Sequence, residues 1–256
     1  MSRRHREFVL WSVLLLPLMA LVLAGEPIAQ DDAYHRFADT RIFWAIPNTL
    51  DVLSNLPFLL VGVAGWMTAR ASMGARLAWQ IHFAGTALVC IGSGWYHWAP
   101  DNASLIWDRL PITIAFMGLF VAMLAEHLDP RTERVFLVPA LLVGVGSVLW
   151  WAHSGDLRAY VWVQFGPLLA LPVLLLFFPG RFSHRYFLLY GLGFYAAAKL
   201  AEHWDREIFE LSAQWVSGHT LKHLLAACAP LCVMTMLRRR LAVDVINNTL
   251  TSARLT

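Results

Sequence analysis

Eight long apolar stretches, separated by short polar ones, make up most of the chain. Each is about 20 residues long, the length that an α-helix needs to cross the hydrocarbon core of a bilayer. We therefore expect eight transmembrane helices, at residues 8–24, 48–69, 77–98, 108–127, 135–152, 160–178, 187–204 and 216–237. The pattern predicts an all-α polytopic membrane helix bundle without an attached soluble domain.

The first apolar stretch follows Arg3, Arg4 and Arg6 and has two interpretations. A cleaved secretory signal also begins with basic residues ahead of an apolar core. We favour a retained helix, because the core is long and contains Trp11 and Pro17. If this segment were cleaved, seven crossings would be left with the same orientation.

Composition agrees with a membrane protein, since 58% of the residues are hydrophobic and only 14% are charged. The formal net charge of +3 is small, and the basic residues gather at the ends of the apolar segments. This distribution is typical of membrane orientation and not of a nucleic-acid-binding surface.

Arginines are distributed unevenly between the two sets of loops. If the N-terminus is cytoplasmic, the cytoplasmic side holds Arg3, Arg4, Arg6, Arg70, Arg76, Arg131, Arg134, Arg181, Arg185, Arg238, Arg239, Arg240 and Arg254. The opposite loops hold Arg36, Arg41, Arg158 and Arg206. The positive-inside rule then places both termini in the cytoplasm. The short loops and compact tail are typical of a bacterial protein, and we expect this chain in the bacterial inner membrane.

Two histidines open the last apolar segment, in the sequence Ser-Gly-His-Thr-Leu-Lys-His at 217–223. His219 and His223 are four residues apart, so a helix places both imidazoles on one face, where they can chelate one metal ion. A hydrocarbon-facing surface would not accommodate them and Lys222 without a large cost. A pair of hydrogen-bonded histidines at a helix end is the alternative. A haem between them is disfavoured, because they share a face.

Other unusual polar residues fall at the same depth. His97 ends the third segment, and Ser93 lies one turn earlier. Asp108 opens the fourth segment. All three therefore fall in the outer half of the bilayer, as His219 and His223 do. Three histidines and an acid at one depth match a catalytic zinc site with an open position for water. Alternatively, Ser93 is a small helix-packing residue and Asp108 a helix N-cap.

These residues resemble the motifs of the alkaline ceramidase family. The resemblance rests on Ser93-x-x-x-His97, on Asp108 followed by Leu110-Pro111, and on His219-x-x-x-His223, and it is supported by Asp51-Val-Leu-Ser-Asn-Leu-Pro. The family belongs to a superfamily of seven-helix membrane hydrolases and receptors that includes the adiponectin-receptor group. The chain looks like a bacterial-type member, with a ceramidase-like seven-helix core at 48–240. The N-terminal helix and outer loop at 1–47 are additional, and a cytoplasmic tail follows at 241–256.

The resemblance implies a zinc-dependent amidohydrolase that works inside the membrane. His97, His219 and His223 would bind zinc, Asp108 would hold or deprotonate the attacking water, and Ser93 would assist at the carbonyl oxygen. The substrate would be ceramide or a related N-acyl lipid, cleaved to a free fatty acid and an amine base.

Further polar residues are candidates for supporting roles. In the eukaryotic ceramidases an acidic calcium-binding cluster precedes the first core helix. The matching stretch here offers Asp39, Asn48 and Asp51, which is a poor match. Residues expected to support the zinc ligands or contact the lipid headgroup are Ser54, Asn55, Lys199, Glu202 and Asp205. The last three could instead form a solvated helix end.

Two other function classes are open. A lipid receptor or sensor of the same fold would hold a structural metal, although the short loops and compact tail offer no signalling domain. A channel or transporter would show paired inverted repeats with broken helices, and no internal repeat is recognisable.

Overall fold

The computed structural model describes residues 1–23 and 25–243, so most of the predicted tail at 241–256 lies outside the described residues. Within them the chain is all-helical and contains no named strand. The helices of the bundle are α1 (Arg3–Leu23), α2 (Thr49–Leu53), α3 (Leu56–Ala71), α4 (Arg76–Trp98), α5 (Asn102–His127), α6 (Arg131–Ser154), α7 (Arg158–Phe177), α8 (Phe187–His203) and α10 (Gly218–Arg239). The predicted fold class is confirmed.

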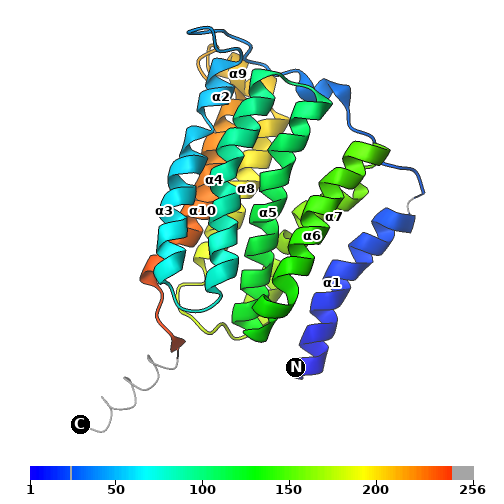
Figure 1. The fold of residues 1–256 in the computed structure, drawn as a ribbon, viewed down its shortest axis with the longest axis vertical. Helices are drawn as coiled ribbons and strands as arrows, with labels where there is room; N and C mark the ends of the chain where they lie inside the picture. Colours follow the sequence, from blue (N-terminus) through cyan, green and yellow to red (C-terminus); the bar gives the residue numbers. More distant parts are fainter. Residues whose placement is uncertain (24, 244–256) are drawn as a thin grey trace.

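Six helical segments are long and apolar enough to cross a membrane, with α2 and α3 counting as one segment. They identify the chain as a multi-pass membrane protein. Two further helices of the bundle, α4 with 23 residues and α8 with 17, correspond to the remaining predicted segments. The N-terminus and the end of α10 lie at one end of the bundle, and α2 lies at the other (Figure 1).

Two predicted segments differ from the observed helices. The segment predicted at 48–69 is divided into α2 and α3, because Pro57 stands in the first turn of α3 and a proline ring cannot continue an existing helix. The segment predicted to open at Asp108 begins at Asn102 instead. Asp101 is its N-cap, with Oδ1 accepting from the Ser104 amide at 2.6 Å. Asp108 therefore lies inside α5, and its interpretation as the N-cap was wrong.

Two short elements lie at the end of the bundle that carries α2. The 3₁₀ helix η1 (Asp32–His35) falls in the stretch that we expected to be a polar loop, and α9 (Asp205–Leu211) follows α8. Both cover the same end of the bundle (Figure 1). Residues of these elements reach the polar side chains described below.

Small residues allow α4 and α5 to pack closely. A Cβ atom on Gly92 would lie 2.0 Å from the Trp107 carbonyl oxygen, and one on Gly118 would lie 2.6 Å from the His82 amide nitrogen. Such close backbone approach is typical of helices that associate within a membrane. It holds the end of α4, which carries His97, against the start of α5.

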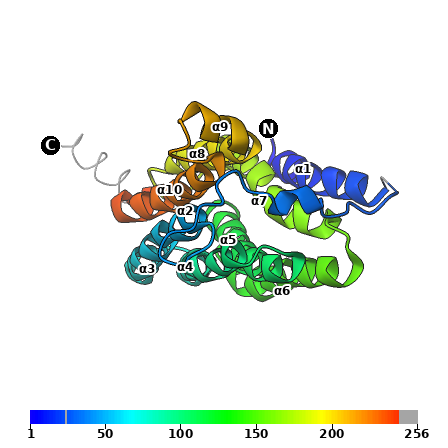
Figure 2. The ribbon, with the colours of Figure 1, turned by 90° about the horizontal axis from the view of Figure 1, so that it is seen from above.

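The additional N-terminal helix α1 packs at the edge of the bundle against α7 (Figure 2). Trp162 Nε1 donates to the Leu14 carbonyl at 3.0 Å, and an Arg6 nitrogen donates to the Phe177 carbonyl at 3.0 Å. Helix α10 packs mainly against α8 and α3. The two histidines of α10 therefore face the interior of the bundle.

Candidate metal centre and adjoining cavity

The start of α10 is fixed by hydrogen bonds to α2. Ser217 is the N-cap, and its hydroxyl accepts from the Thr220 amide at 2.9 Å. The buried Asp51 carboxylate accepts from the hydroxyl of Thr220 at 2.7 Å and from that of Ser217 at 3.3 Å. An acidic group near a helix N-terminus also interacts favourably with the helix dipole. These contacts set the rotation of the first turns of α10, which carry His219 and His223.

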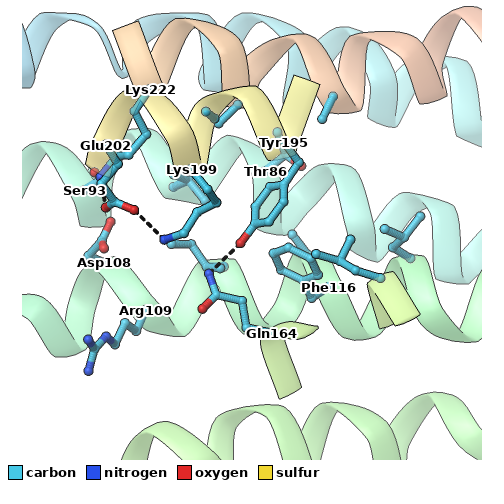
Figure 3. Close-up of a pocket in the computed structure, with 18 of the residues that line it drawn as sticks. Thr86, Ser93, Asp108, Arg109, Phe116, Gln164, Tyr195, Lys199, Glu202 and Lys222 are labelled. Atoms are coloured by element: carbon cyan, nitrogen blue, oxygen red, sulfur yellow. Dashed lines mark hydrogen bonds and ion pairs between the residues drawn. The ribbon is translucent and has the colours of Figure 1, made fainter. Parts of the chain in front are cut away.

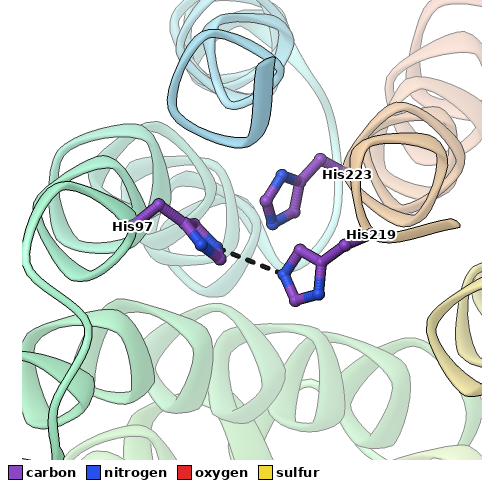
Figure 4. Close-up of side chains that lie close together, drawn as sticks. All are labelled: His97, His219 and His223. Atoms are coloured by element: carbon purple, nitrogen blue, oxygen red, sulfur yellow. Dashed lines mark hydrogen bonds between the residues drawn. The ribbon is translucent and has the colours of Figure 1, made fainter. Parts of the chain in front are cut away.

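His97, His219 and His223 form a buried cluster, with one ring nitrogen of each lying within 4.8 Å of the others. Their rings point toward one another from α4 and α10 (Figure 4). Nε2 of His97 and Nε2 of His219 lie 3.3 Å apart. All three side chains are at least 96% buried, and Phe37 packs on two of them, with ring centroids 4.6 Å from His97 and 4.7 Å from His219. The cluster can hold a metal ion.

The partners of His223 leave its Nε2 available for a metal. The Ser54 hydroxyl lies 2.7 Å from Nδ1 of His223 and donates to the Asp51 carbonyl at 3.0 Å. A hydroxyl has one proton to donate, so toward the imidazole it must accept, and the His223 proton is assigned to Nδ1. Nε2 then carries a lone pair.

Nε2 of His219 also carries a lone pair, but a different contact leads to this assignment. Nζ of Lys222 lies 2.7 Å from Nε2 of His219, and an ammonium group can only donate. Nε2 is therefore unprotonated, and the facing Nε2 of His97 competes with Lys222 for that lone pair. A cation between the histidines could accept the lone pairs of both facing nitrogens. Nδ1 of His97 is buried without a hydrogen-bond partner among the described residues.

The backbone around the cluster is also fixed. The side-chain amide of Asn48 donates to the backbone carbonyl of His97 at 2.8 Å. The Asp205 carboxylate accepts from the backbone N–H of His219 at 2.7 Å. The other oxygen of Asp205 accepts from the Ala38 amide at 2.9 Å. Asp205 thus connects the start of α9 to the start of α10 and to the loop before α2, which contains Ala38.

A cavity of about 440 Å³ begins beside the histidines and runs down the bundle. Its polar end is lined by Ser93, Asp108 and His223 among others, and Ser93 and Asp108 lie close together in Figure 3. Its deeper part is lined mainly by apolar side chains, including Phe116, Leu171, Leu192, Ala226 and Val233. The cavity is therefore polar at one end and mainly apolar over the rest of its length.

Gln164 and Tyr195 are polar exceptions within the deeper part. The Gln164 amide donates to the Tyr195 hydroxyl at 2.7 Å and connects α7 to α8 (Figure 3). This hydrogen bond gives each side chain one polar partner in the apolar region.

A cluster of charged groups lies next to the three histidines. Glu202 accepts from Lys222 at 2.9 Å, pairs with Lys199, and accepts from the Tyr34 hydroxyl at 3.1 Å. Burial, reinforced by the neighbouring carboxylates, raises the pKa of Tyr34 well above its usual range, so Tyr34 stays a neutral donor. Glu202 thus holds Lys222 close to His219.

The residues considered for calcium contact different partners. Asp39 forms an ion pair with Arg41 at 2.7 Å, Asn48 is bonded to the His97 carbonyl, and Asp51 is bonded to Ser217 and Thr220. Calcium at these residues stays a prediction. Asn55, expected near the metal ligands, donates to the Asp51 carbonyl at 2.8 Å and so supports α2.

Sequence reasoning did not identify several polar residues of the cavity. Arg109 adjoins Asp108 in the sequence, and an intramembrane charge is itself a signal of function that could have identified it. Gln30 and Tyr34 come from the 25–47 loop, which has no periodicity to predict where its side chains point.

No protein-family model matches this chain, and no curated protein matches it.

Proposed function

We propose that this protein is a zinc-dependent intramembrane hydrolase that cleaves the amide bond of ceramide or a related N-acyl lipid. The observation that carries the proposal is the position of the histidine cluster. It adjoins the polar end of a cavity that also holds Asp108 and Ser93 and continues into an apolar region.

The donor set suits zinc. Neutral imidazole is a preferred zinc ligand, and catalytic zinc sites use three protein ligands with a fourth position open. Two nitrogens bound tetrahedrally at about 2.0–2.1 Å from zinc are separated by about 3.3–3.4 Å. The 3.3 Å between the facing nitrogens of His97 and His219 agrees with that separation.

The residues of the polar end can perform amide hydrolysis. A bound zinc ion would supply a nucleophile from water near neutral pH and polarise the carbonyl. The Asp108 carboxylate accepts the proton of the attacking water and returns it to the leaving nitrogen. Ser93 donates a hydrogen bond to the carbonyl oxygen. The water oxygen joins the acyl carbon, the C–N bond breaks, and a fatty acid and an amine are released.

The apolar part of the cavity suits an acyl chain. Along α10 the cavity is lined from His223, at its polar end, to Val233 in the apolar part, a span of ten residues or about 15 Å of helix. A lipid can reach it by lateral diffusion in the bilayer. We place this protein in a bacterial inner membrane with both termini cytoplasmic. The candidate metal centre, at the end of α4 and the start of α10, lies at the opposite end of the bundle from the N-terminus and the end of α10 (Figure 1), and it then faces outward.

The test is fatty-acid release by the purified protein from N-acyl lipids that include ceramide. We expect turnover that a chelator removes, that added zinc restores, and that is lost in His219→Ala. A zinc-loaded protein that releases no fatty acid from any of these lipids would contradict the hydrolase assignment. It would favour a receptor or sensor of the same fold with a structural metal.

A further inference from the structure

Arg109 is a buried cation at the polar end of the cavity. Its side chain is only 6% exposed, and Nη2 donates to the Gln30 side-chain oxygen at 2.5 Å. The guanidinium stacks over Trp151 at 4.1 Å and over Tyr160 at 4.7 Å. These aromatic rings fix its plane, so its orientation is set before any ligand arrives.

The charge of Arg109 is not neutralised by an ion pair. Among the described residues, no carboxylate oxygen lies within 4.0 Å of it, and its Nη1 is buried with no hydrogen-bond partner. A buried charge without a counterion is costly inside a membrane protein, and such charges are usually retained for function. An anion bound at Nη1 would remove that cost.

The other charges of the cavity do not supply this anion. The described residues that line the cavity include three cations, Arg109, Lys199 and Lys222, and three carboxylates, Asp31, Asp108 and Glu202. Glu202 is shared by both lysines. Asp31 is exposed to solvent, and neither it nor Asp108 lies within 4.0 Å of the Arg109 guanidinium. Arg109 is therefore the cation of the cavity lining that has no carboxylate partner among the described residues.

We propose that Arg109 binds an acidic group on the headgroup side of the lipid, a carboxylate or a phosphate. Its planar fork of donors matches either group. A neutral hydroxyl could accept one hydrogen bond but would leave the charge uncompensated. This inference rests on the proposed function and narrows its substrate, because an acidic N-acyl lipid, such as an N-acyl amino acid, is preferred to a neutral one such as ceramide.

The first experiment measures binding without hydrolysis. Hexadecyl phosphate and hexadecanol share a chain and lack an amide, so their affinities can be compared on the purified zinc-loaded protein. We expect the phosphate to bind about 10–100-fold more tightly, as charge-assisted hydrogen bonds give. Arg109→Gln should abolish the preference, Arg109→Lys should keep part of it, and Arg206→Gln, an exposed arginine outside the cavity, should keep all of it.

The second experiment measures turnover of N-palmitoylglycine and N-palmitoylethanolamine. We expect a higher kcat/KM for the acidic lipid, and loss of that preference in Arg109→Gln mainly through KM. If neither lipid is cleaved but the Arg109-dependent binding preference holds, the hydrolase assignment fails and the anion site stands. Equal affinities and equal turnover in the wild type would overturn the anion site alone.

Two further outcomes are decisive. If millimolar inorganic phosphate displaces hexadecyl phosphate as well as a lipid anion does, the site binds free anions, and its assignment to a lipid is overturned. If palmitate binds as tightly as N-palmitoylglycine in an Arg109-dependent manner, the residue holds the fatty-acid product and the headgroup assignment is overturned. If Arg109→Gln does not fold, the wild-type preference and its reduction in Arg109→Lys decide the question.

Discussion

Replacing Ser54 by alanine tests how the candidate metal ligands are held. The Ser54 hydroxyl is the partner of Nδ1 of His223, at 2.7 Å, and it also donates to the Asp51 carbonyl. Both Ser54 and His223 are buried, so water cannot easily take the place of the hydroxyl. Alanine needs no extra space, and the change is confined to the hydrogen bonds.

The expected magnitude follows from those contacts. A buried donor left without a partner costs about 1–3 kcal/mol. Loss of a hydrogen bond to a metal-ligating histidine weakens metal affinity by about 10–100-fold, or about 1.4–2.8 kcal/mol. The two estimates overlap. We therefore expect Ser54→Ala to bind zinc about 10–100-fold more weakly than the wild type.

The assay is competition with a chelator of known zinc affinity, on purified protein. Ser147→Ala is the matched control, because Ser147 is also buried but its hydroxyl donates to a carbonyl of its own helix, that of Gly144, at 2.7 Å. It should leave zinc affinity unchanged. Zinc affinity in Ser54→Ala equal to that of the wild type would refute the role of this hydroxyl.

Three further predictions concern the general base, the helix packing and the topology. Asp108→Asn should retain zinc and lose about 10²–10⁴-fold in fatty-acid release; unchanged turnover would show that Asp108 is not the base. Gly92→Ala, which places a Cβ 2.0 Å from the Trp107 carbonyl, should lower stability by about 1–3 kcal/mol in a denaturation assay. Gly94→Ala, with open space around it, should not, and equal effects would contradict the close packing. A cysteine placed at Asp101 should react with an impermeant reagent from outside the cell. Labelling only from the cytoplasmic side would show that the orientation is the opposite of the one predicted.

Hydropathy predicted the helices because a bilayer sets their length. Their boundaries depended on local chemistry that periodicity does not contain. The capping box of Asp101 with Ser104 starts α5 earlier than its apolar run, and Pro57 separates α2 from α3. The spacing of His219 and His223 was sufficient to place them on one face of a helix. Bringing His97 to them required the packing of distant helices, which no local pattern specifies.

The contacts around the histidines were harder to predict. Ser54 and Glu202 were expected near the metal ligands, but a sequence cannot show that one reaches Nδ1 of His223 and the other holds Lys222 beside His219. Arg109 was not predicted as a site residue, because the motif that it adjoins points only to Asp108. Its stacking on Trp151 depends on the packing of α6 against α5.

The central claim is that the three buried histidines bind zinc, and elemental analysis of the purified protein tests it most directly. We predict one zinc ion per chain in the wild type and in His203→Ala, where the histidine is exposed at the same end of the bundle. We predict that His223→Ala loses the zinc while the helical content is retained. Wild-type protein without zinc, or full zinc occupancy in His223→Ala, would contradict the claim.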